Sequence, residues 1–492
     1  MPGLRRSPTG TISPVGTSRT IWILGDQLNL GVASLDGADP DTDRILMIRS
    51  EAKVASKPFH PLRLQLVEEA MDAFSGQLRD RGFRVDDRRA ATFAEGVEAH
   101  RRRHRPDAVR AMEPMSWDGL RTMERLGVET VRSNQFLCHY EDFAEWAAER
   151  SGRRLVMEDF YRRQRARLGY LMDGDEPAGG RWNLDRENRE PPPRDGGPWP
   201  RAGRDADWPV TRRQALARLR AFVADVLPRF GPHQDAMVAG EWRLAHSLLS
   251  SSMNIGLLHP REVCDAVEEA YRAGEVPIAS AEGFIRQVIG WREYVWGVYW
   301  LWMPGFRRRN GLGAHRPLPP AFRDGPEATR MACVASALQA VRDHGYAHHI
   351  QRLMVLGNLA LLAGVRPREM VDWMWASFID GAEWVMIPNV VGMALHADGG
   401  RMMTKPYAAG GAYIDRMSDH CGGCPYDPRR RTGDGACPFT TLYWDFLARH
   451  RDRFAGNGRM RQQVRGLERL RDLPEVRERA REVLARLDAG DL

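Results

Sequence analysis

The sequence Ile21-Trp22-Ile23-Leu24-Gly25-Asp26-Gln27-Leu28 predicts a buried β-strand that ends in a Gly-Asp turn. Similar apolar runs occupy residues 45–48 and 128–131, and a helix-like segment covers residues 61–81. Short apolar runs that alternate with amphipathic helices are typical of a parallel sheet with crossover helices. We therefore expect a Rossmann-like α/β domain over residues 19–150.

Downstream, the spacing of the apolar residues changes. Residues 174–209 are rich in Pro, Gly, Arg and Asp, which predicts a connector between domains over 151–210. Beyond residue 211 the apolar residues recur at helical spacing, so we expect a large all-α domain over 211–458. Residues 459–492 are rich in Arg and Glu and predict a charged, solvated helix. Residues 1–18 lack an apolar core segment and predict a disordered arm rather than a secretory signal.

The composition limits the class of protein to which the chain can belong. Its 492 residues are enough for two or three domains, and 43% hydrophobic residues indicate a globular chain. A net charge of +7 favours phosphate-bearing partners such as nucleic acid, although an Arg-rich soluble protein would show the same charge. No apolar run approaches the roughly 20 residues of a membrane helix, so we expect a cytoplasmic protein without a membrane partner.

Four cysteines have the spacing of a metal site. Cys421-Gly-Gly-Cys424 is followed thirteen positions later by Cys437, and Cys333 lies far upstream. Four thiolates suit either zinc or an iron–sulfur cluster, and spacing alone does not choose between them. Zinc ribbons usually use two close cysteine pairs, whereas Cys333 stands alone in a helical stretch, which favours iron–sulfur. Four unrelated buried cysteines are the alternative.

Two helical segments carry candidate ligand-binding side chains. The hydroxyl-rich segment 246–256 enters a helix, where hydroxyls and free N–H groups can hold a pyrophosphate, although serines also cap helices routinely. In segment 284–294, Arg286 and Arg292 lie beside an aromatic wall that includes Trp291 and could receive a ring system. An ordinary core helix with arginines at its rim is the alternative.

A third segment contains the adjacent residues His348 and His349. Paired imidazoles can relay protons at physiological pH, ligate a metal, or pack as interior side chains. The surrounding region is rich in tryptophan, which usually indicates packing but can relay electrons beside a redox cofactor. These tryptophans are Trp291, Trp296, Trp300, Trp302, Trp373, Trp375 and Trp384.

In combination, these motifs resemble the iron–sulfur bacterial branch of the photolyase and cryptochrome family, the prokaryotic (6-4) photolyase-like proteins. The resemblance spans roughly residues 20–449 and rests on the four cysteines in family order and on six motifs. The motifs are Gly25-Asp26-Gln27-Leu28, Ser247-Leu248-Leu249-Ser250, Gly290-Trp291-Arg292-Glu293-Tyr294, Ala347-His348-His349-Ile350-Gln351-Arg352-Leu353-Met354, Pro388-Asn389-Val390-Val391-Gly392-Met393 and Lys405-Pro406-Tyr407.

The resemblance implies three bound groups. It implies FAD in the helical domain, a 4Fe-4S cluster, and 6,7-dimethyl-8-ribityllumazine as an antenna in the first domain. The implied cluster ligands are Cys333, Cys421, Cys424 and Cys437, which makes zinc the minor alternative. The implied FAD contacts are Ser247, Leu249, Ser250, Asn254, Arg286, Trp291, Arg292, Asp380 and Asn389. The implied antenna contacts are Gly25, Asp26, Gln27, Glu51 and Glu113.

The activity implied by the resemblance is light-driven repair of pyrimidine-pyrimidone (6-4) photoproducts in UV-damaged DNA by a monomeric enzyme. Excited reduced FAD would donate an electron to the flipped-out lesion, and His349 would supply a proton with His348 as its partner. Asp235 and Tyr407 would orient the lesion, and Trp373 would carry electrons close to the flavin. A damaged pair stacks poorly and is easily extruded, which fits such an enzyme. The alternative is a blue-light photoreceptor, a cryptochrome of the same fold without repair activity.

Four departures from the family pattern accompany this resemblance. Gly325 stands where an aromatic residue is usual and Met374 where Tyr is usual, so we expect a photoreduction route that is either broken or rerouted through Trp375 or Trp384. Met386 stands where Glu is common and cannot exchange a proton. Residues 51–60 lack the usual Tyr and paired His, so the antenna pocket is expected in an altered form.

Overall fold

The apolar run at residue 21 forms the central strand of a five-stranded parallel sheet in the computed structural model, which describes residues 18–193 and 208–492. The arm expected over residues 1–18 lies outside these ranges except for Ser18, as does the stretch 194–207 of the expected connector. The strand order is β3-β2-β1-β4-β5, with β1 (Arg19–Ile23), β2 (Arg44–Ser50), β3 (Arg84–Ala90), β4 (Ala108–Met112) and β5 (Glu129–Val131). The order reverses at β1, as in a Rossmann-like sheet, so the predicted fold class of this part is confirmed.

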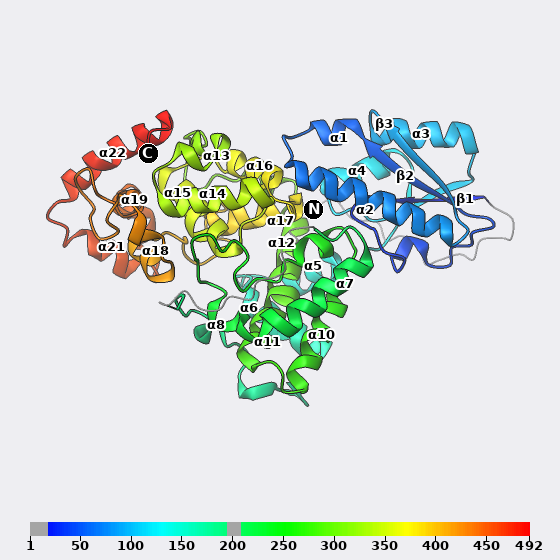
Figure 1. Cartoon of the computed structure of the whole chain (residues 1–492), viewed down its shortest axis with the longest axis horizontal. Coiled ribbons are helices and arrows are strands. Elements are labelled where there is room, and N and C mark those ends of the chain that lie inside the picture. Colours follow the sequence, from blue (N-terminus) through cyan, green and yellow to red (C-terminus); the bar gives the residue numbers. More distant parts are fainter. Residues whose placement is uncertain (1–17, 194–207) are drawn as a thin grey trace.

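Helices cover both faces of this sheet (Figure 1). Helix α2 (Pro61–Asp80) packs on one face, and α3 (Phe93–His104) and α4 (Trp117–Arg125) pack on the other. Ile21 and Ile23 of β1 pack with Phe74 of α2, whereas Trp22 packs with Val97 of α3, because alternate residues of a strand point to opposite faces. A sheet covered on both faces buries its central strand from Thr20 to Ile23, which explains the continuous apolar run.

The remainder of the described chain is mostly helical, as the sequence predicts. A two-stranded ladder of β6 (Met172–Asp173) and β7 (Glu176–Pro177) lies among the helices. None of the described helices is long and apolar enough to cross a membrane. The helices not yet named are α1 (Glu51–Ala55), α5 (Tyr140–Glu149), α6 (Met157–Leu168), α7 (Arg212–Ala221), α8 (Leu227–His233), α9 (Ser250–Asn254), α10 (Pro260–Arg272), α11 (Ile278–Ile285), α12 (Glu293–Trp302), α13 (Ala321–Asp324), α14 (Ala332–His344), α15 (Asn358–Ala363), α16 (Pro367–Ser377), α17 (Glu383–Ile387), α18 (Gly411–Met417), α19 (Pro438–Arg449), α20 (Arg451–Ala455), α21 (Arg461–Leu467) and α22 (Leu473–Ala489).

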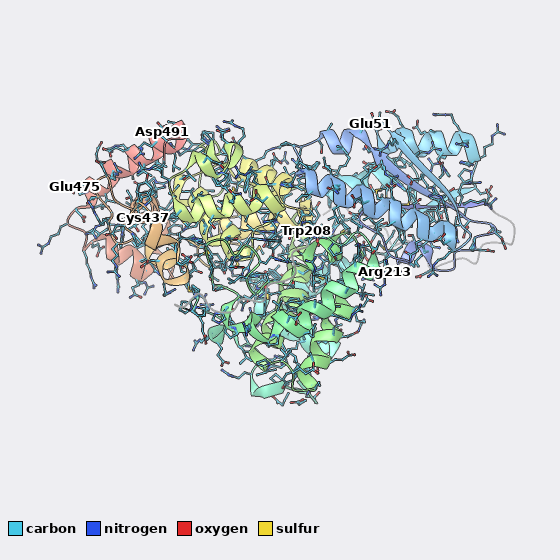
Figure 2. All side chains as sticks on the ribbon, in the orientation of Figure 1. Glu51, Trp208, Arg213, Cys437, Glu475 and Asp491 are labelled. Atoms are coloured by element: carbon cyan, nitrogen blue, oxygen red, sulfur yellow. The ribbon has the colours of Figure 1, made fainter. Side chains whose placement is uncertain are left out.

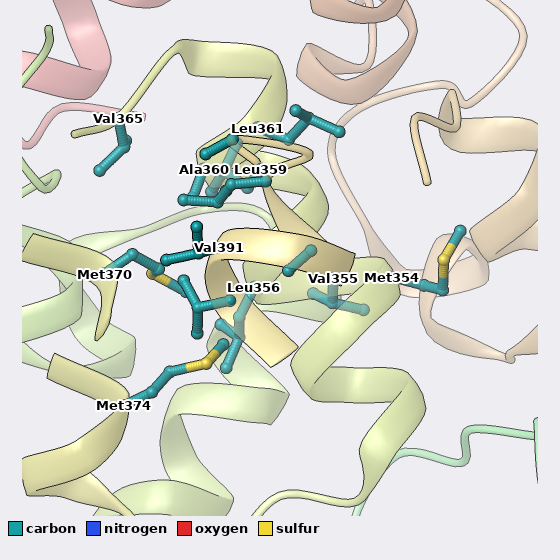
Figure 3. Packing of buried hydrophobic residues seen from close by; sticks show 14 of the residues in the cluster. Met354, Val355, Leu356, Leu359, Ala360, Leu361, Val365, Met370, Met374 and Val391 are labelled. Atoms are coloured by element: carbon teal, nitrogen blue, oxygen red, sulfur yellow. The ribbon is translucent and has the colours of Figure 1, made fainter. Parts of the chain in front are cut away.

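Wide helical turns lie next to several of the predicted site residues. The described chain contains seven-residue π-helices at η5 (Arg286–Arg292), η8 (Gln351–Gly357) and η9 (Pro388–Ala394). Leu356 of η8, Val391 of η9 and Met374 of α16 belong to one buried cluster (Figure 3). π-Turns inside helices are frequent at functional sites, because the extra residue changes the direction of the side chains around it.

The segment around the start of α2 joins the sheet to the helical part. The N–H of His60 donates a hydrogen bond to the carbonyl of Ala376 (2.9 Å), and the Arg63 guanidinium donates to the carbonyl of Trp375. Lys57 Nζ lies 4.6 Å from the centroid of the Trp375 ring. These contacts attach the sheet domain to α16 through both backbone and side chains.

The C-terminal segment differs from the single solvated helix expected over 459–492. It forms two helices, α21 and α22, and α22 packs against α19. Val476, Ala480, Val483 and Leu487 are buried. They recur every three or four residues and so form one apolar stripe between the charged side chains.

Gly297 is expected to be necessary for the packing of α12 on α5. A Cβ atom at this position would lie 2.1–2.5 Å from ring carbons of Phe143. Gly297→Ala should therefore reduce the free energy of unfolding by about 1–3 kcal/mol, measured as a lower Tm by circular dichroism. Gly305→Ala is the control, because its Cβ would meet nothing within 4 Å. Equal Tm values for the two variants would contradict this packing argument.

Candidate functional site

Five polar side chains from four segments form one hydrogen-bonded network in the helical part. Ser250 Oγ donates to the Asp380 carboxylate (2.7 Å), and Asn254 Nδ2 donates to the backbone carbonyl of Asp380 (2.9 Å). Arg292 donates to Asn254 Oδ1 (3.3 Å), and Arg352 donates to both carboxylate oxygens of Asp380 (2.9 and 3.2 Å). Sequence reasoning proposes four of these residues as cofactor contacts. It misses Arg352, whose only signal is its place in the histidine motif.

Arg292 keeps free donors at the centre of this network. Its guanidinium lies 4.4 Å from the centroid of the Phe136 ring and 4.7 Å from that of Trp384, and burial lowers its pKa to about 10. The Nε and Nη2 atoms of Arg292 have no hydrogen-bond partner among the described residues, nor do the buried hydroxyls of Ser251 and Ser252. Buried donors without partners are unfavourable. These atoms therefore fit a ligand rich in acceptor atoms, such as one with phosphates or a heteroaromatic ring.

The other residues expected to contact the cofactor lie outside this network. Arg286 donates to Glu282 (3.2 Å) and pairs with Asp185 (3.3 Å). Its Nη2 atom is buried and has no described partner, so this second group also has a free donor. The remaining residues have local contacts: Ser247 accepts from the N–H of Leu249, Trp291 packs edge-on against Tyr294, and Asn389 donates to the carbonyl of Val385.

Three imidazoles form a compact cluster. The ring of His348 stacks on that of His246, with centroids 4.5 Å apart and planes at 12°, and His349 lies edge-on to His246 at 5.3 Å. Burial lowers the pKa of His246 and of His348 well below the ordinary value, so both rings are neutral at pH 7. The side chain of His349 is 45% exposed. One ring nitrogen of each of the three imidazoles lies within 4.8 Å of the other two, so the cluster has the geometry either to exchange protons or to hold a metal ion.

Gln234 and Asp235 hold this cluster from one side. The backbone of Gln234 accepts a hydrogen bond from His246, and Asp235 Oδ1 lies 3.4 Å from Nε2 of His349. Burial, followed by nearby carboxylates that include Asp235, raises the pKa of Tyr407 to about 12, so the phenol stays protonated. The structure thus brings the other three residues proposed as catalytic, His348, His349 and Tyr407, into the surroundings of Asp235. Sequence reasoning misses His246 as a member, because it precedes His348 by about a hundred residues.

The four clustered cysteines line one cavity. Cys333 lies on α14, Cys421 and Cys424 lie between α18 and α19, and Cys437 immediately precedes α19. Cys437 is found in the part of the molecule away from the sheet (Figure 2). Burial raises the pKa of Cys333, and the other three thiols raise it further. Burial and mutual repulsion make it unfavourable for these thiols to ionise when no cation is present. A bound cation would stabilise the thiolates, so the cavity is suited to binding a metal.

The four thiols lie further apart than a single zinc ion requires. A Zn–S bond of about 2.3 Å brings the sulfur atoms of a tetrahedral site to about 3.8 Å from one another. In the part of the chain that the structure describes, no three of these thiols have sulfur atoms within 4.8 Å of one another. The wall is also closely fitted, because a Cβ on Gly411 would lie 2.8 Å from Cys437 Sγ.

Two of the residues expected to contact the antenna are hydrogen-bonded within the protein, and a third is exposed. The Glu113 carboxylate accepts hydrogen bonds from His139 and Tyr140, each at 2.7 Å. Gln27 donates to the backbone carbonyl of Glu113 (3.1 Å). Both Glu113 and Gln27 therefore connect chain segments at the strand ends, and Glu51 is exposed at the start of α1.

Asp26 is the expected antenna residue with a free polar atom. It is half-buried, its Oδ1 atom is buried without a described partner, and desolvation raises its pKa to about 6 against the opposing charges of Lys53 and Arg63. These three residues lie at the carboxyl ends of β1 and β2, where open α/β sheets bind ligands. Lys53 lies on α1 and Arg63 on α2, and neither belongs to a sequence motif. Sequence reasoning therefore could not assign them to this position.

Comparison with known proteins settles the family. The chain is 40% identical over 486 residues to a protein of Agrobacterium fabrum named (6-4) photolyase, with 90% of this chain and 94% of the relative covered. The chain belongs to the photolyase and cryptochrome family. Residues 21–225 also match the family model of the deoxyribodipyrimidine photo-lyase-related proteins.

Solved structures of the photolyase and cryptochrome family share the fold. A bacterial class III photolyase from Agrobacterium tumefaciens is similar with a TM-score of 0.61 at 16% identity, over 98% of this chain and 100% of that chain. A cryptochrome from Synechocystis is similar with a TM-score of 0.53 at 14% identity, over 77% and 83% of the two chains. The sheet and the helical part together therefore form the photolyase architecture.

Within this photolyase fold, Trp373 lies against the core. Its indole N–H donates to the carbonyl of Phe322 (2.7 Å), and its ring contacts those of Phe322 and Phe378. The adjacent Met374 is buried and offers no aromatic ring for an onward step. Gly325 has a backbone φ of +100°, which residues with a side chain rarely adopt, so glycine suits this turn.

The two alternative tryptophans have different surroundings. Trp375 lies under Lys57 at the junction between the sheet domain and the helical part. The ring centroid of Trp384 lies 5.7 Å from that of Trp296, and the centroid of Trp296 lies 5.5 Å from that of Trp300. Trp384 therefore begins a continuous series of indoles. Of the two, only Trp384 also contacts Arg292.

The buried, neutral state of His246 and His348 should make stability depend on pH. Between about pH 6.5 and pH 5, the unfolded chain binds protons on these rings and the folded chain does not, so the free energy of unfolding should decrease on acidification. Urea unfolding at several pH values measures this slope. His246→Phe should make the slope shallower, and the exposed His315→Gln is the control. An identical slope in wild type and His246→Phe would contradict the buried neutral state.

Proposed function

We propose that this protein is a light-dependent DNA-repair enzyme that acts on pyrimidine-pyrimidone (6-4) photoproducts. The observation that carries the proposal is the group of His348, His349, Asp235 and Tyr407, in which one exposed imidazole lies beside a carboxylate. Reversal of a (6-4) photoproduct requires a proton for the hydroxyl group that is transferred, whereas light sensing requires no such acid. The relation to a protein named (6-4) photolyase supports the same function.

Reduced FAD, when bound and excited by light, supplies the electron that opens the lesion. In this chain Ser250, Asn254, Arg292 and Asp380 would hold the cofactor, because they form one network in which Arg292 keeps two free donors. Arg352 would position Asp380 through its two hydrogen bonds. The further contacts that we propose are Ser247, Leu249, Arg286, Trp291 and Asn389, with Trp373 as the electron carrier.

His349 would be the proton donor. Asp235 orients Nε2 of His349 and balances the charge of the protonated ring. His246 and His348 stay neutral because they are buried, which leaves His349 as the exposed imidazole of the cluster. His349 would give this proton to the hydroxyl oxygen of the lesion as that group returns to the neighbouring ring. Tyr407, which remains a phenol, would donate a hydrogen bond to the lesion.

The four-cysteine cavity would hold a 4Fe-4S cluster rather than zinc. The separation of the thiols supports this choice, because a single zinc ion would need them closer together. All four residues are soft thiolate ligands, as such clusters require. Bound to Cys333 on α14 and to Cys437 before α19, the cluster would connect distant segments and have a structural role.

A ribityllumazine antenna would bind at the carboxyl ends of β1 and β2. Asp26 has a free carboxylate oxygen that could accept from ribityl hydroxyls, and Lys53 and Arg63 could donate to ring carbonyls. Gly25 and Glu51 would border this position. Gln27 and Glu113 would support it from the strand ends.

His349→Ala should abolish repair while damaged DNA is still bound. The test illuminates protein that contains reduced FAD together with an oligonucleotide carrying one (6-4) photoproduct, and restored thymines are counted. Loss of the proton donor should slow repair by about 100-fold or more. Binding of the damaged duplex, measured by fluorescence anisotropy, should remain close to that of wild type. His315→Gln is the control for removal of an exposed imidazole.

Repair by His349→Ala at the wild-type rate would refute the proposed acid. Wild-type protein that shows flavin and cluster absorption but no repair, even after chemical reduction of the flavin, would instead indicate a blue-light photoreceptor. Gly325, Met374 and Met386 would then be the residues that explain the difference.

Cys424→Ala should remove iron from the purified protein. Wild type should contain iron and show a broad absorption shoulder at roughly 400 nm, and the variant should lose both and have a lower Tm. Cys264→Ala is the control, because Cys264 is a buried thiol that does not line the cavity. Stoichiometric zinc in wild type would contradict the cluster, and an unchanged Tm in Cys424→Ala would contradict its structural role.

A further inference from the structure

We propose that His246, His348 and His349 form a binding site for a divalent transition-metal ion such as Zn²⁺, and that the bound ion stops repair by occupying a nitrogen of His349. The proposal rests on the proposed function, because it takes His349 as the proton donor. Zinc binding itself can be measured in the dark and without DNA. The site can therefore be tested even if the protein repairs no lesion.

The three imidazoles have a spacing that a metal ion can bridge after a small movement. One ring nitrogen of each lies within 4.8 Å of the other two. Three atoms that are no more than 4.8 Å apart have a common point at most about 2.8 Å from each, whereas a Zn–N bond is about 2.0–2.1 Å long. Each nitrogen would therefore move by about 0.8 Å or less to bind one ion.

Two of the three rings have a hydrogen-bond partner that orients them for a metal. The backbone carbonyl of Gln234 accepts a hydrogen bond from His246. Because Nε2 of His246 is buried without a described partner, Nδ1 makes this bond and Nε2 is left as the ligand atom. Asp235 Oδ1 lies 3.4 Å from Nε2 of His349, which leaves Nδ1 of that ring. Histidines that bind metals almost always donate their other N–H to a carbonyl or a carboxylate in this way.

His348 is the ring that must turn when an ion binds. It stacks on His246 with the two planes at 12°, so its ring must rotate before both rings can direct a lone pair at one ion. Both nitrogens of His348 are buried and have no hydrogen-bond partner among the described residues. The rotation would therefore break no described hydrogen bond. The ion would also give a partner to a buried nitrogen, whose isolation is unfavourable.

The charges around the cluster are compatible with a cation. Asp235 places a carboxylate beside His349, and the nearby guanidinium of Arg352 is paired with both carboxylate oxygens of Asp380 (2.9 and 3.2 Å). Neutral imidazoles are common ligands of zinc, copper and nickel. The side chain of His349 is 45% exposed, so an ion can reach the cluster from solvent and keep an open coordination position there.

A second group of metal-type side chains in the described ranges is less suited to an ion. It consists of Asp86, His100 and His104. One nitrogen of His100 bonds to Thr20 Oγ1 (2.8 Å) and the other to Asp86 (2.5 Å), and Asp86 also accepts from Arg88. An ion would have to displace these bonds, so this group serves as a comparison for the test.

A bound ion would remove the proposed acid. An imidazole donates a proton readily when both of its nitrogens are protonated. A nitrogen that binds an ion cannot hold a proton at the same time, so ion and proton compete for His349. Zinc should therefore stop repair, and removal of the ion by EDTA should restore it.

Isothermal titration calorimetry with Zn²⁺ in the dark tests the site. The protein is first treated with EDTA and desalted, so that every ion counted is one that was added. His246→Phe keeps a flat ring but removes a ligand, so it should bind one zinc ion fewer than wild type. Asp235→Asn should weaken binding by about 10–100-fold, because it removes the carboxylate that orients His349. His104→Gln is the matched control and should bind zinc like wild type. Circular dichroism and Tm check that the variants fold.

X-ray absorption at the zinc edge identifies the ligands. The complex with one zinc ion should show nitrogen or oxygen at about 2.0–2.2 Å and no sulfur at about 2.3 Å. Sulfur ligands would place the ion in the four-cysteine cavity and overturn the proposal. An unchanged number of ions in His246→Phe, or an equal loss in His104→Gln, would also overturn it.

Repair assays separate this proposal from the proposed function. One equivalent of zinc should abolish repair of the (6-4) oligonucleotide by wild type, and EDTA should restore it. Repair at the full rate by zinc-loaded protein would overturn the inhibitory role. Absence of repair without zinc would refute the proposed function, while the calorimetry and the zinc spectrum would still decide whether the histidines bind the ion.

Discussion

The ion pair between the partly buried Arg352 and the buried Asp380 is the contact on which the arrangement of the site depends. Asp380 also accepts hydrogen bonds from Ser250 and Asn254, and Arg352 also donates to the carbonyl of Ala347, next to the adjacent histidines. Loss of either partner would leave a buried charge uncompensated, which typically costs about 3–5 kcal/mol. One pair therefore holds both α9 and the histidine turn, so the network around Asp380 and the acid–base cluster keep a fixed spacing.

The parts of this structure that sequence could predict are those set by local chemistry. A run such as Ile21-Trp22-Ile23-Leu24 is apolar at every position because both faces of the strand are covered, so the strand is evident without its neighbours. The four cysteines are also evident from sequence alone. Thiol side chains are ligands for soft metals, so cysteines can be considered as one group even when they lie far apart along the chain. Their common cavity is the outcome that the Cys421-Gly-Gly-Cys424 spacing suggests.

The parts that sequence could not predict are set by packing between distant segments. His246 contacts His348 only because two helical segments meet in the folded chain. Arg352 likewise binds Asp380, which belongs to a different segment. Lys53 comes close to Asp26 from a short helix without a motif. The apolar stripe of α22 is difficult to recognise in the sequence because charged residues surround it. In the π-helices, the extra residue turns the side chains away from the directions that a regular α-helix would give them.

The junction at α2 and α16 has a consequence for how light would be used. Excitation passes between two chromophores at a rate that depends on the angle between their transition dipoles as well as on their separation. His60, Lys57 and Arg63 attach the sheet to α16 through backbone, ring and guanidinium contacts, so a dye bound to one part cannot turn freely relative to a dye bound to the other. For the two chromophores proposed above, loosening this junction would change the colour sensitivity of the protein, and Arg63 belongs both to the junction and to the proposed antenna position.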